Sequence, residues 1–271
     1  AALVLPHLGN HAVAAANDAH PDARALEASR NVGSGGPAVL PPSTKFTLPA
    51  AYPQLLQTPS PTTREALKKM REVPGLSLGT YQGLDALLVD TPLAKPAVSL
   101  FGGQVVSFAP AGQEDVFWLS PQRADLPTPI RGGTPVCWPY FGRQGQTAEV
   151  PAHGLVRTLP WRLVEARREA DGTVVLELQP PPMQDLALEL RMQLRIGRTL
   201  EQRLVTRNTG PGVVSFTEAL HNYFNVSDAE QVRIEGLAGL PFHDKNDRGN
   251  RHVQQGDWHL LDPRDPGRAD F

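Results

Sequence analysis

The chain has 271 residues, which is enough for one large domain or for two of ordinary size. Its 26 basic and 28 acidic residues leave a formal net charge of −2, which gives no broad positive field for nucleic acid or for an anionic membrane. The single cysteine, Cys137, excludes an internal disulfide and a multi-cysteine metal cluster, and it fits a reducing, cytoplasmic compartment.

Residues 1–50 are predicted to form an N-terminal extension. They are rich in Ala, Pro, Gly and Asn, include the flexible stretch NVGSGGP, and lack a sustained period of 2 or 3.6 residues. The opening AALVL is too short for a signal peptide and has no basic segment before it. The sequence has no run of about 18 apolar residues, so no membrane span is expected.

Residues 51–75 are predicted to be a linker with one short helix. In TTREALKKMREV, the apolar residues Leu67, Met70 and Val73 recur at three-residue spacing after a threonine that can cap a helix. Pro74 then ends the pattern, because proline cannot continue a helix.

From residue 76 onward the sequence pattern is typical of β-strands. Short apolar runs such as ALLVD, TVVLELQ and QRLVTRN are separated by Gly, Pro and Asp. In LALELRMQLRI, residues 186–196, the apolar residues fall on one face and Glu189, Arg191 and Arg195 on the other. READGTVV predicts a hairpin, and no amphipathic helices alternate with the strands. The pattern predicts an all-β, antiparallel sandwich over residues 76–271.

Three polar clusters contain the candidate functional residues: 129–142, 152–161 and 217–224. In the first, Arg131 offers a planar fork of donors to phosphate oxygens, and the adjacent Gly132 and Gly133 would let the backbone approach a ligand closely. The alternative is a surface arginine at an ordinary turn.

The second cluster contains His153 and Arg157. Their spacing would join them on a helix, but Gly154 and the flanking prolines favour a loop or an irregular strand. A histidine there could donate to a sugar hydroxyl, and Arg157 could contact phosphate. The alternative is a structural histidine bonded to a backbone carbonyl.

The third cluster places His221 in ALHNYF, among apolar and aromatic neighbours. Such neighbours would partly dehydrate the imidazole and hold its orientation, as proton transfer requires. A core histidine with satisfied hydrogen bonds is the alternative reading of the same six residues.

Metal and nucleophile chemistry have weaker support in the sequence. A zinc site would need several of these residues to converge: His153, His221, His243, Asp244 and Glu218. HExxH and similar tight ligand spacings do not occur. Cys137 has no nucleophile motif around it, and GTPVCWPY is typical of a packed strand, so a core thiol is predicted. Phosphate loops and dinucleotide fingerprints are also absent from the sequence.

Five motifs together resemble those of one family. They are LFGGQVVSFAPAGQEDVFWLSP, IRGGTPVCWPYFG, AHGLVRTLPW, TEALHNYFNVSD and VRIEGLAG, in that order. From about residue 76 to its end, the chain resembles the glucose-6-phosphate 1-epimerase, or hexose-6-phosphate mutarotase, branch of the galactose-mutarotase-like superfamily. The resemblance implies a large antiparallel β-sandwich with the sugar on the concave face of one sheet.

The resemblance also implies an activity and its residues. The expected enzyme interconverts the α and β anomers of aldohexose 6-phosphates by acid–base ring opening, with no cofactor, no metal and no covalent intermediate. His221 of LHNYF matches the family's catalytic histidine. The expected substrate-binding residues are Arg131, His153, Arg157 and Asp244, with Arg143 as a further phosphate neighbour.

One departure from the family's pattern concerns the general base. The family places this glutamate near its C-terminal end, after a VVWNP-like strand, and neither motif occurs here. The sandwich is therefore expected to be incomplete at its C-terminus, and Glu201 and Glu218 do not match the glutamate motif. Two alternatives stay open: a sugar-phosphate-binding module without catalysis, and an aldose 1-epimerase for unphosphorylated sugars.

Overall fold

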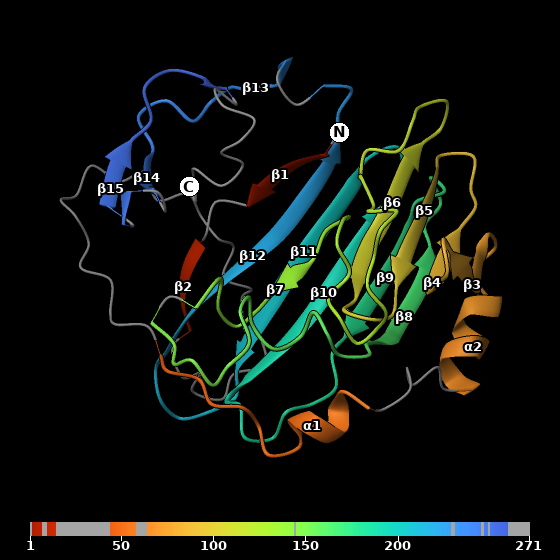
Figure 1. Ribbon diagram of the computed structural model, residues 1–271. Coiled ribbons are helices and arrows are strands. Elements are labelled where there is room, and N and C mark those ends of the chain that lie inside the picture. The colour runs from red at the N-terminus through yellow and green to blue at the C-terminus, as the bar shows by residue number, and fades with distance from the viewer. Residues whose placement is uncertain are drawn as a thin grey trace.

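The computed structural model describes residues 2–6, 10–14, 44–57, 64–143, 145–228, 231–244, 247–248 and 250–259. Antiparallel strands dominate these residues, with two short helices at one end (Figure 1). The predicted flexible stretch NVGSGGP lies outside the described residues, as do the last twelve residues of the chain.

The helices are α1, Tyr52–Leu55, and α2, Arg64–Arg71. Helix α2 confirms the predicted short helix, and Met70 and Val73 are buried as its spacing requires. Lys69 donates from Nζ to the carbonyl of Val164 at 2.6 Å, which ties the helix to the neighbouring strand. No helix in the described part of the chain is long and apolar enough to cross a membrane.

Two four-stranded sheets form the body of the molecule. The first runs in the order β3-β4-β5-β6, made of Leu76–Tyr81, Leu84–Val89, Ala94–Ser99 and Gln104–Pro110. The second runs in the order β11-β10-β9-β8, where β8 to β11 are Arg162–Arg168, Val174–Gln179, Leu188–Ile196 and Leu200–Asn208. Every pairing in both sheets is antiparallel, because each strand connects to its neighbour through a short turn.

Strand β10 shows why these residues form a half-buried sheet. Its apolar side chains, from Leu188 to Ile196, are all buried, while Glu189 and Arg191 between them are exposed. The predicted hairpin between β8 and β9 is also present: Gly172 has a φ of 90° and donates its N–H to the carbonyl of Glu169 at 3.0 Å. Both sequence predictions are confirmed.

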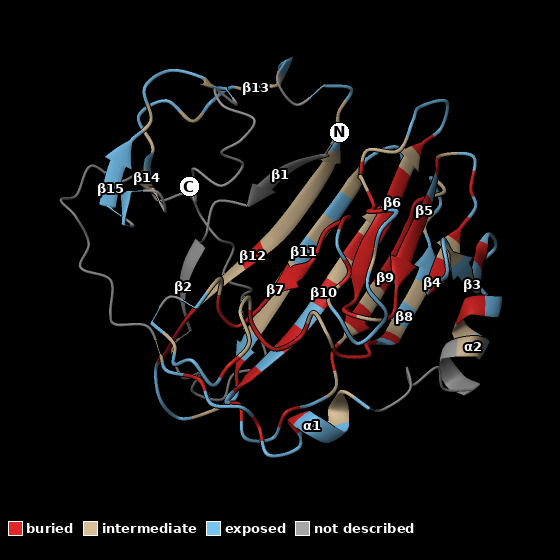
Figure 2. Ribbon diagram, viewed as in Figure 1, coloured by how far each residue is buried: buried red, intermediate tan, exposed pale blue. Residues whose placement is uncertain are grey.

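The core lies between these two sheets. Buried side chains from both, such as Leu87 and Val98 of the first and Leu176 and Met192 of the second, belong to one cluster. Figure 2 shows the buried residues concentrated on the strands of this region. The predicted antiparallel sandwich is therefore confirmed.

A third group of strands is built around β12, Val214–Asn225. It pairs with β1, Ala2–Pro6, and β2, Asn10–Ala14, and also with the two-residue β7, Val136–Cys137. The sequence did not predict β1 and β2, because five-residue strands leave too short a pattern to detect. The boundaries at residues 50 and 75 stay a prediction.

Two small two-stranded sheets follow β12 in the chain. Strand β13, Arg233–Ile234, pairs with β16, Trp258–His259. Strand β14, Pro241–Asp244, pairs with β15, Asn250–Val253. In the topology these pairs are separate from the sheets of the sandwich.

Strand β12 has two faces with different surroundings. Phe216, Leu220 and Phe224 pack on the core cluster, so the even-numbered side chains face the interior. The odd-numbered side chains of Thr217, His221 and Tyr223 therefore project from the opposite face. This alternation presents the predicted catalytic histidine on the side of the strand away from the core.

Candidate active site

His221 lies within a group of aromatic rings on the outward face of β12. Its ring centroid is 5.6 Å from that of His153, 5.3 Å from Tyr223 and 6.0 Å from Phe141. The side chain is half-buried. His221 projects from the face opposite to Phe216 and Leu220, and its Nδ1 atom is buried, so the choice between a catalytic and a structural histidine stays a prediction.

His153 reaches this group from a loop, as the glycine and prolines around it predict. It has a φ of 66°, and Gly154 after it has a φ of 82°. The amide N–H of Gly142 donates to Nδ1 of His153 at 3.2 Å, and the amide of His153 donates to the carbonyl of Gly142 at 2.8 Å. Because Nδ1 accepts a hydrogen bond, the neutral ring carries its proton on Nε2.

Gly154 is required where it stands. A Cβ atom added to it would lie 2.0 Å from the backbone oxygen of Trp138, a distance that no real side chain tolerates. The amide of Leu155 donates to that same oxygen at 2.8 Å. The left-handed turn at residues 153 and 154 is therefore fixed against the segment that leads out of β7.

Two guanidinium groups act on Tyr223 beside His221. Burial raises the pKa of Tyr223, while the positive charges of Arg131 and Arg157 oppose this rise. Tyr223 therefore keeps its proton near neutral pH and is a hydrogen-bond donor or acceptor there. Arg157 is half-buried and donates from Nη2 to the carbonyl of Ala152 at 2.9 Å, whereas Arg131 is exposed.

The glycines after Arg131 have a role in the fold. A Cβ atom on Gly132 would lie 2.6 Å from the backbone oxygen of Trp118, and one on Gly133 would lie 2.2 Å from that of Val105. The expectation that these glycines also let the backbone approach a ligand stays a prediction. They let the loop pass close to its own neighbouring strands.

The sequence did not identify the aromatic residues that line the site. Trp118 stacks on Tyr223 with ring centroids 6.1 Å apart, and its amide donates to the carbonyl of Tyr223 at 2.9 Å. Phe141 contacts both histidine rings. Tyr223 follows His221 by two residues, so strand period alone places both on one face. Trp118 and Phe141 arrive from distant segments, and no local signal marks them.

Glu218 does not face His221. It lies on the interior face of β12, where Thr206 donates its hydroxyl to Oε2 at 3.4 Å. Thr206 in turn accepts the indole N–H of Trp138 at 3.0 Å. Desolvation by burial raises the pKa of Glu218 to about 7, and the Thr206 hydrogen bond only partly opposes it. This carboxyl group therefore cannot serve as the base opposite His221.

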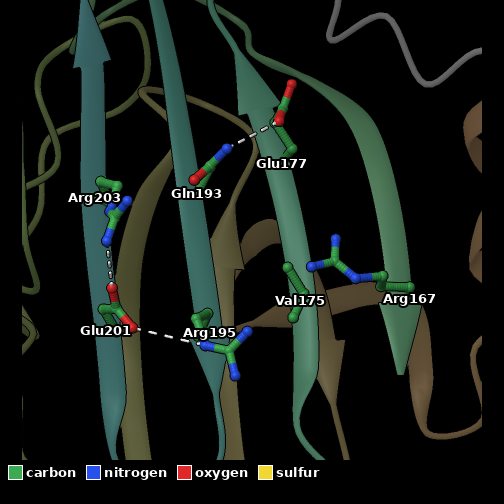
Figure 3. A pocket seen from close by; sticks show the side chains of 7 residues that line it. All are labelled: Arg167, Val175, Glu177, Gln193, Arg195, Glu201 and Arg203. Atoms are coloured by element: carbon green, nitrogen blue, oxygen red, sulfur yellow. Dashed lines mark hydrogen bonds and ion pairs between the residues drawn. The ribbon is translucent and has the colours of Figure 1, made fainter. Parts of the chain in front are cut away.

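Glu201 lies on the outer face of the β8–β11 sheet, in a shallow recess lined by charged residues (Figure 3). It pairs with Arg203 at 3.4 Å and with Arg195 at 3.7 Å. The inner face of this sheet packs on the core, so the recess faces away from the core, and its lining contains neither His221 nor His153. The recess does not belong to the candidate active site.

Asp244 and Arg143 come from two further segments of the chain, the β14 strand and the loop after Gly142. Asp244 ends β14, in the hairpin with β15, where its Cα pairs with that of Asn250. Arg143 is exposed and donates from Nε to the carbonyl of Val150 at 3.1 Å. The substrate roles of both residues stay predictions.

Cys137 is confirmed as a core thiol. It is 1% exposed on β7, and burial raises the pKa of its thiol to about 12. Across the described residues, no three His, Cys, Asp or Glu side chains gather as metal ligands would. The side chain of His243 lies outside the described residues.

Comparison with known proteins matches the part of the chain that contains these histidines and arginines. The model of the aldose 1-epimerase family matches residues 87–266. An Escherichia coli K12 protein named "Putative glucose-6-phosphate 1-epimerase" is 38% identical over 189 residues, which cover 66% of this chain and 61% of that protein. A Salmonella typhimurium protein of the same name is 38% identical over 183 residues, covering 64% of this chain and 58% of its own length.

The fold agrees with a solved relative. The crystal structure of a "putative mutarotase" from Salmonella typhimurium matches with a TM-score of 0.62 and 32% identity, covering 70% of this chain and 65% of that chain. This chain spans about three fifths of the length of the curated relatives it matches. The family model covers more than half of the chain, and the chain belongs to the aldose 1-epimerase family.

Proposed function

We propose that this chain binds aldohexose 6-phosphates and interconverts their α and β anomers, with His221 as the general acid. The observation that carries the proposal is the placement of His221 and His153 with ring centroids 5.6 Å apart, beside a tyrosine on which two arginine charges act. Proton-transfer groups and phosphate-binding groups thereby adjoin one another. The names of the related proteins support the same substrate class.

The chemistry requires two proton transfers across the sugar ring. Protonated His221 gives its proton to the ring oxygen, while a base takes the proton of the C1 hydroxyl, and the bond between C1 and the ring oxygen breaks. Rotation about C1–C2 turns the aldehyde, and closure with the reverse proton transfers gives the other anomer. The Nε2–H of His153 donates to a sugar oxygen and holds the substrate in place.

The phosphate is assigned to Arg131 and Arg157. Guanidinium groups bind phosphate oxygens through two parallel hydrogen bonds, which fix both position and orientation. Arg157 is already held by the carbonyl of Ala152, so part of its side-chain entropy is lost before the substrate arrives. Arg131 is exposed and supplies the outer contact. Asp244 is proposed to bind sugar hydroxyls, as the family resemblance implies.

The general base is proposed to be the family's glutamate, whose motif does not occur in the given sequence. Glu218 points into the interior and Glu201 to the far side of the second sheet, so neither replaces it. This observation favours a second candidate function, in which the chain binds the sugar phosphate without turning it over. Such binding uses the arginines and His153 and needs no base.

Exchange spectroscopy by NMR tests the proposal directly. With glucose 6-phosphate, the cross peaks between the two anomeric protons should grow faster with the protein than without it, and His221→Gln should remove the acceleration. Unchanged exchange together with saturable binding of glucose 6-phosphate would establish the second candidate. If the chain accelerates the exchange of glucose as strongly as that of glucose 6-phosphate, the substrate is an unphosphorylated aldose.

A further inference from the structure

The turn at Phe141 and Gly142 connects β12 to His153 through a series of hydrogen bonds. The amide of Phe141 donates to Oγ1 of Thr217 at 2.9 Å. The amide of the next residue, Gly142, donates to Nδ1 of His153 at 3.2 Å. From these contacts we propose that Thr217 is a positioning residue of the active site, which fixes the tautomer and orientation of His153 through the 141–142 turn. This role rests on the proposed function.

Thr217 is held rigidly enough to act in this way. Its own amide donates to the carbonyl of Pro139 at 3.2 Å, so backbone and side chain both bind the same segment, at Pro139 and at Phe141. Two consecutive attachments fix the direction in which the turn leaves the strand. The Gly142 amide is thereby aimed at the imidazole and not at solvent.

The same strand also carries His221, so β12 is connected to both histidines. Thr217 and His221 are four residues apart on one face of β12, a separation of roughly 13 Å along an extended strand. The amide of His221 donates to the carbonyl of Pro135 at 2.9 Å, so this part of the strand is fixed by the segment that also contains Pro139. Strand β12 therefore places one histidine directly and the other through Thr217.

The ring of Phe141 lies beside both histidines, so the turn that Thr217 holds contacts both imidazoles. Its ring centroid lies 4.8 Å from that of His153 and 6.0 Å from that of His221. A shift of the Phe141 backbone would move this ring and the Gly142 amide together. The loss of one hydroxyl at Thr217 would therefore change the surroundings of both imidazoles.

The tautomer of His153 is the quantity that this network controls. An imidazole in water exchanges its proton between its two nitrogens, whereas an amide N–H aimed at Nδ1 permits only the form protonated on Nε2. If the amide turns away, both neutral forms become populated. A donor at Nε2 is then present in only part of the molecules, and its direction varies.

The matched variants differ in one group each. Thr217→Val keeps the shape and removes the acceptor, Thr217→Ser keeps the acceptor, and Thr217→Ala removes it without a branched side chain. Thr44→Val is the control, because Oγ1 of Thr44 accepts the amide N–H of Ser215 at 2.9 Å on the same strand, whereas the amide of Phe141 in the turn is bound by Thr217. It reports what the loss of one such hydrogen bond to β12 does when the bond between Thr217 and Phe141 is kept.

The deciding measurement is the pair of side-chain ¹⁵N shifts of His153, assigned by their loss in His153→Gln. We expect wild type, Thr217→Ser and Thr44→Val to show a protonated Nε2 and an unprotonated Nδ1, and Thr217→Val and Thr217→Ala to show shifts averaged between the two tautomers. Wild-type shifts in a folded Thr217→Val or Thr217→Ala protein would overturn the proposal. This readout needs no turnover, so it stands or fails separately from the proposed activity.

Kinetics then tests the consequence for a chain that turns over. Anomer exchange should fall between about 10-fold and 100-fold in kcat for Thr217→Val, with Thr217→Ser close to wild type, because small misplacements of a substrate-holding group reduce rate on this scale. Thr44→Val should keep its kcat. Equal losses of kcat in Thr217→Val and Thr44→Val would mean that only the stability of β12 matters, and would contradict a positioning role.

Discussion

The imidazole rings of His153 and His221 meet edge to face, with centroids 5.6 Å apart and an interplanar angle of 77°. One ring comes from a loop and the other from a long strand, so their contact depends on the tertiary fold. Because both rings would contact the same substrate, the effects of substituting the two histidines should not be independent.

We therefore expect the substitutions His153→Gln and His221→Gln to be non-additive in a double-mutant cycle. His221→Gln should reduce kcat by about 10²-fold to 10⁴-fold, the usual scale for loss of a general acid. Once the proton donor is gone, His153→Gln should cost little more, because correct placement of the substrate no longer leads to reaction. The measurement is the anomer exchange rate of the four proteins. Losses that multiply would show that the two residues act separately.

Substitution of Arg131 should affect catalysis alone, whereas substitution of Arg157 should affect both catalysis and stability. Arg131→Ala should lower kcat/KM for glucose 6-phosphate by about 10-fold to 100-fold and leave glucose unaffected, because a charge-assisted hydrogen bond contributes about 1.5–3 kcal/mol. Arg157→Ala should also lower the free energy of unfolding, since this half-buried side chain binds the carbonyl of Ala152.

Arg203→Ala is the matched control for both arginines, because Arg203 lies in the charged recess on the far sheet (Figure 3). It should change neither substrate preference nor kcat/KM. A similar loss of phosphate selectivity in Arg203→Ala would point to a general effect of net charge and would remove the assignment of Arg131.

The sequence predicted the parts of this fold that depend on local pattern. Strand β10 was identifiable because one of its faces is buried and the other exposed, so its side chains alternate. The same period places Tyr223 beside His221. Strands β1 and β2 were missed because they exist by pairing with β12, and a five-residue pattern in an Ala-rich stretch does not specify that partner.

The site itself depended on contacts that no local pattern contains. His153 reaches His221 because Gly154 passes against Trp138 and because Gly142 binds its ring, and these contacts join residues beyond the reach of a local pattern. The glycines at 132 and 133 have φ values of 124° and 58°, and their sequence indicates such a special backbone without showing what lies beside it. Motif order suggested the candidate residues, and only the tertiary structure shows where they lie.

Glu218 should make the stability of the chain depend on pH. Its pKa is raised from 4.5 to about 7 in the folded state, so folding favours the protonated form. Below about pH 4.5 the carboxyl group is neutral in both states, and stability is then lost as pH rises towards 7 and levels off above it. The shift corresponds to roughly 3 kcal/mol at most.

Glu218→Gln is the variant that isolates this effect, because it stays neutral and still accepts the hydrogen bond of Thr206. Urea unfolding at a series of pH values should give similar free energies for both proteins near pH 4 and a more stable variant at pH 8. A constant difference across this range would show that Glu218 does not carry the pH dependence.

Cys137 should resist alkylation for as long as the chain is folded. Its thiol is 1% exposed, and burial raises its pKa to about 12, so almost no thiolate is present at pH 8. Iodoacetamide followed by mass spectrometry should show modification only in denaturant, at a rate that follows unfolding. Rapid modification of the native protein would mean that β7 opens locally.

Gly154 and Gly112 allow the cost of a steric clash to be separated from that of a left-handed backbone. Both have positive φ values, 82° and 75°, but a Cβ atom on Gly154 would lie 2.0 Å from the backbone oxygen of Trp138, whereas one on Gly112 would have nothing within 4 Å. Gly112→Ala should therefore cost about 1 kcal/mol of unfolding free energy.

Gly154→Ala should cost about 3 kcal/mol more than that, because its neighbour is backbone and cannot rotate away. It should also displace His153, so the side-chain ¹⁵N shifts of this histidine should change in Gly154→Ala and stay the same in Gly112→Ala. Urea unfolding and these shifts check the two expectations independently. Equal costs in the two variants would mean that the 153–154 turn yields, and that Trp138 does not fix the loop that presents His153.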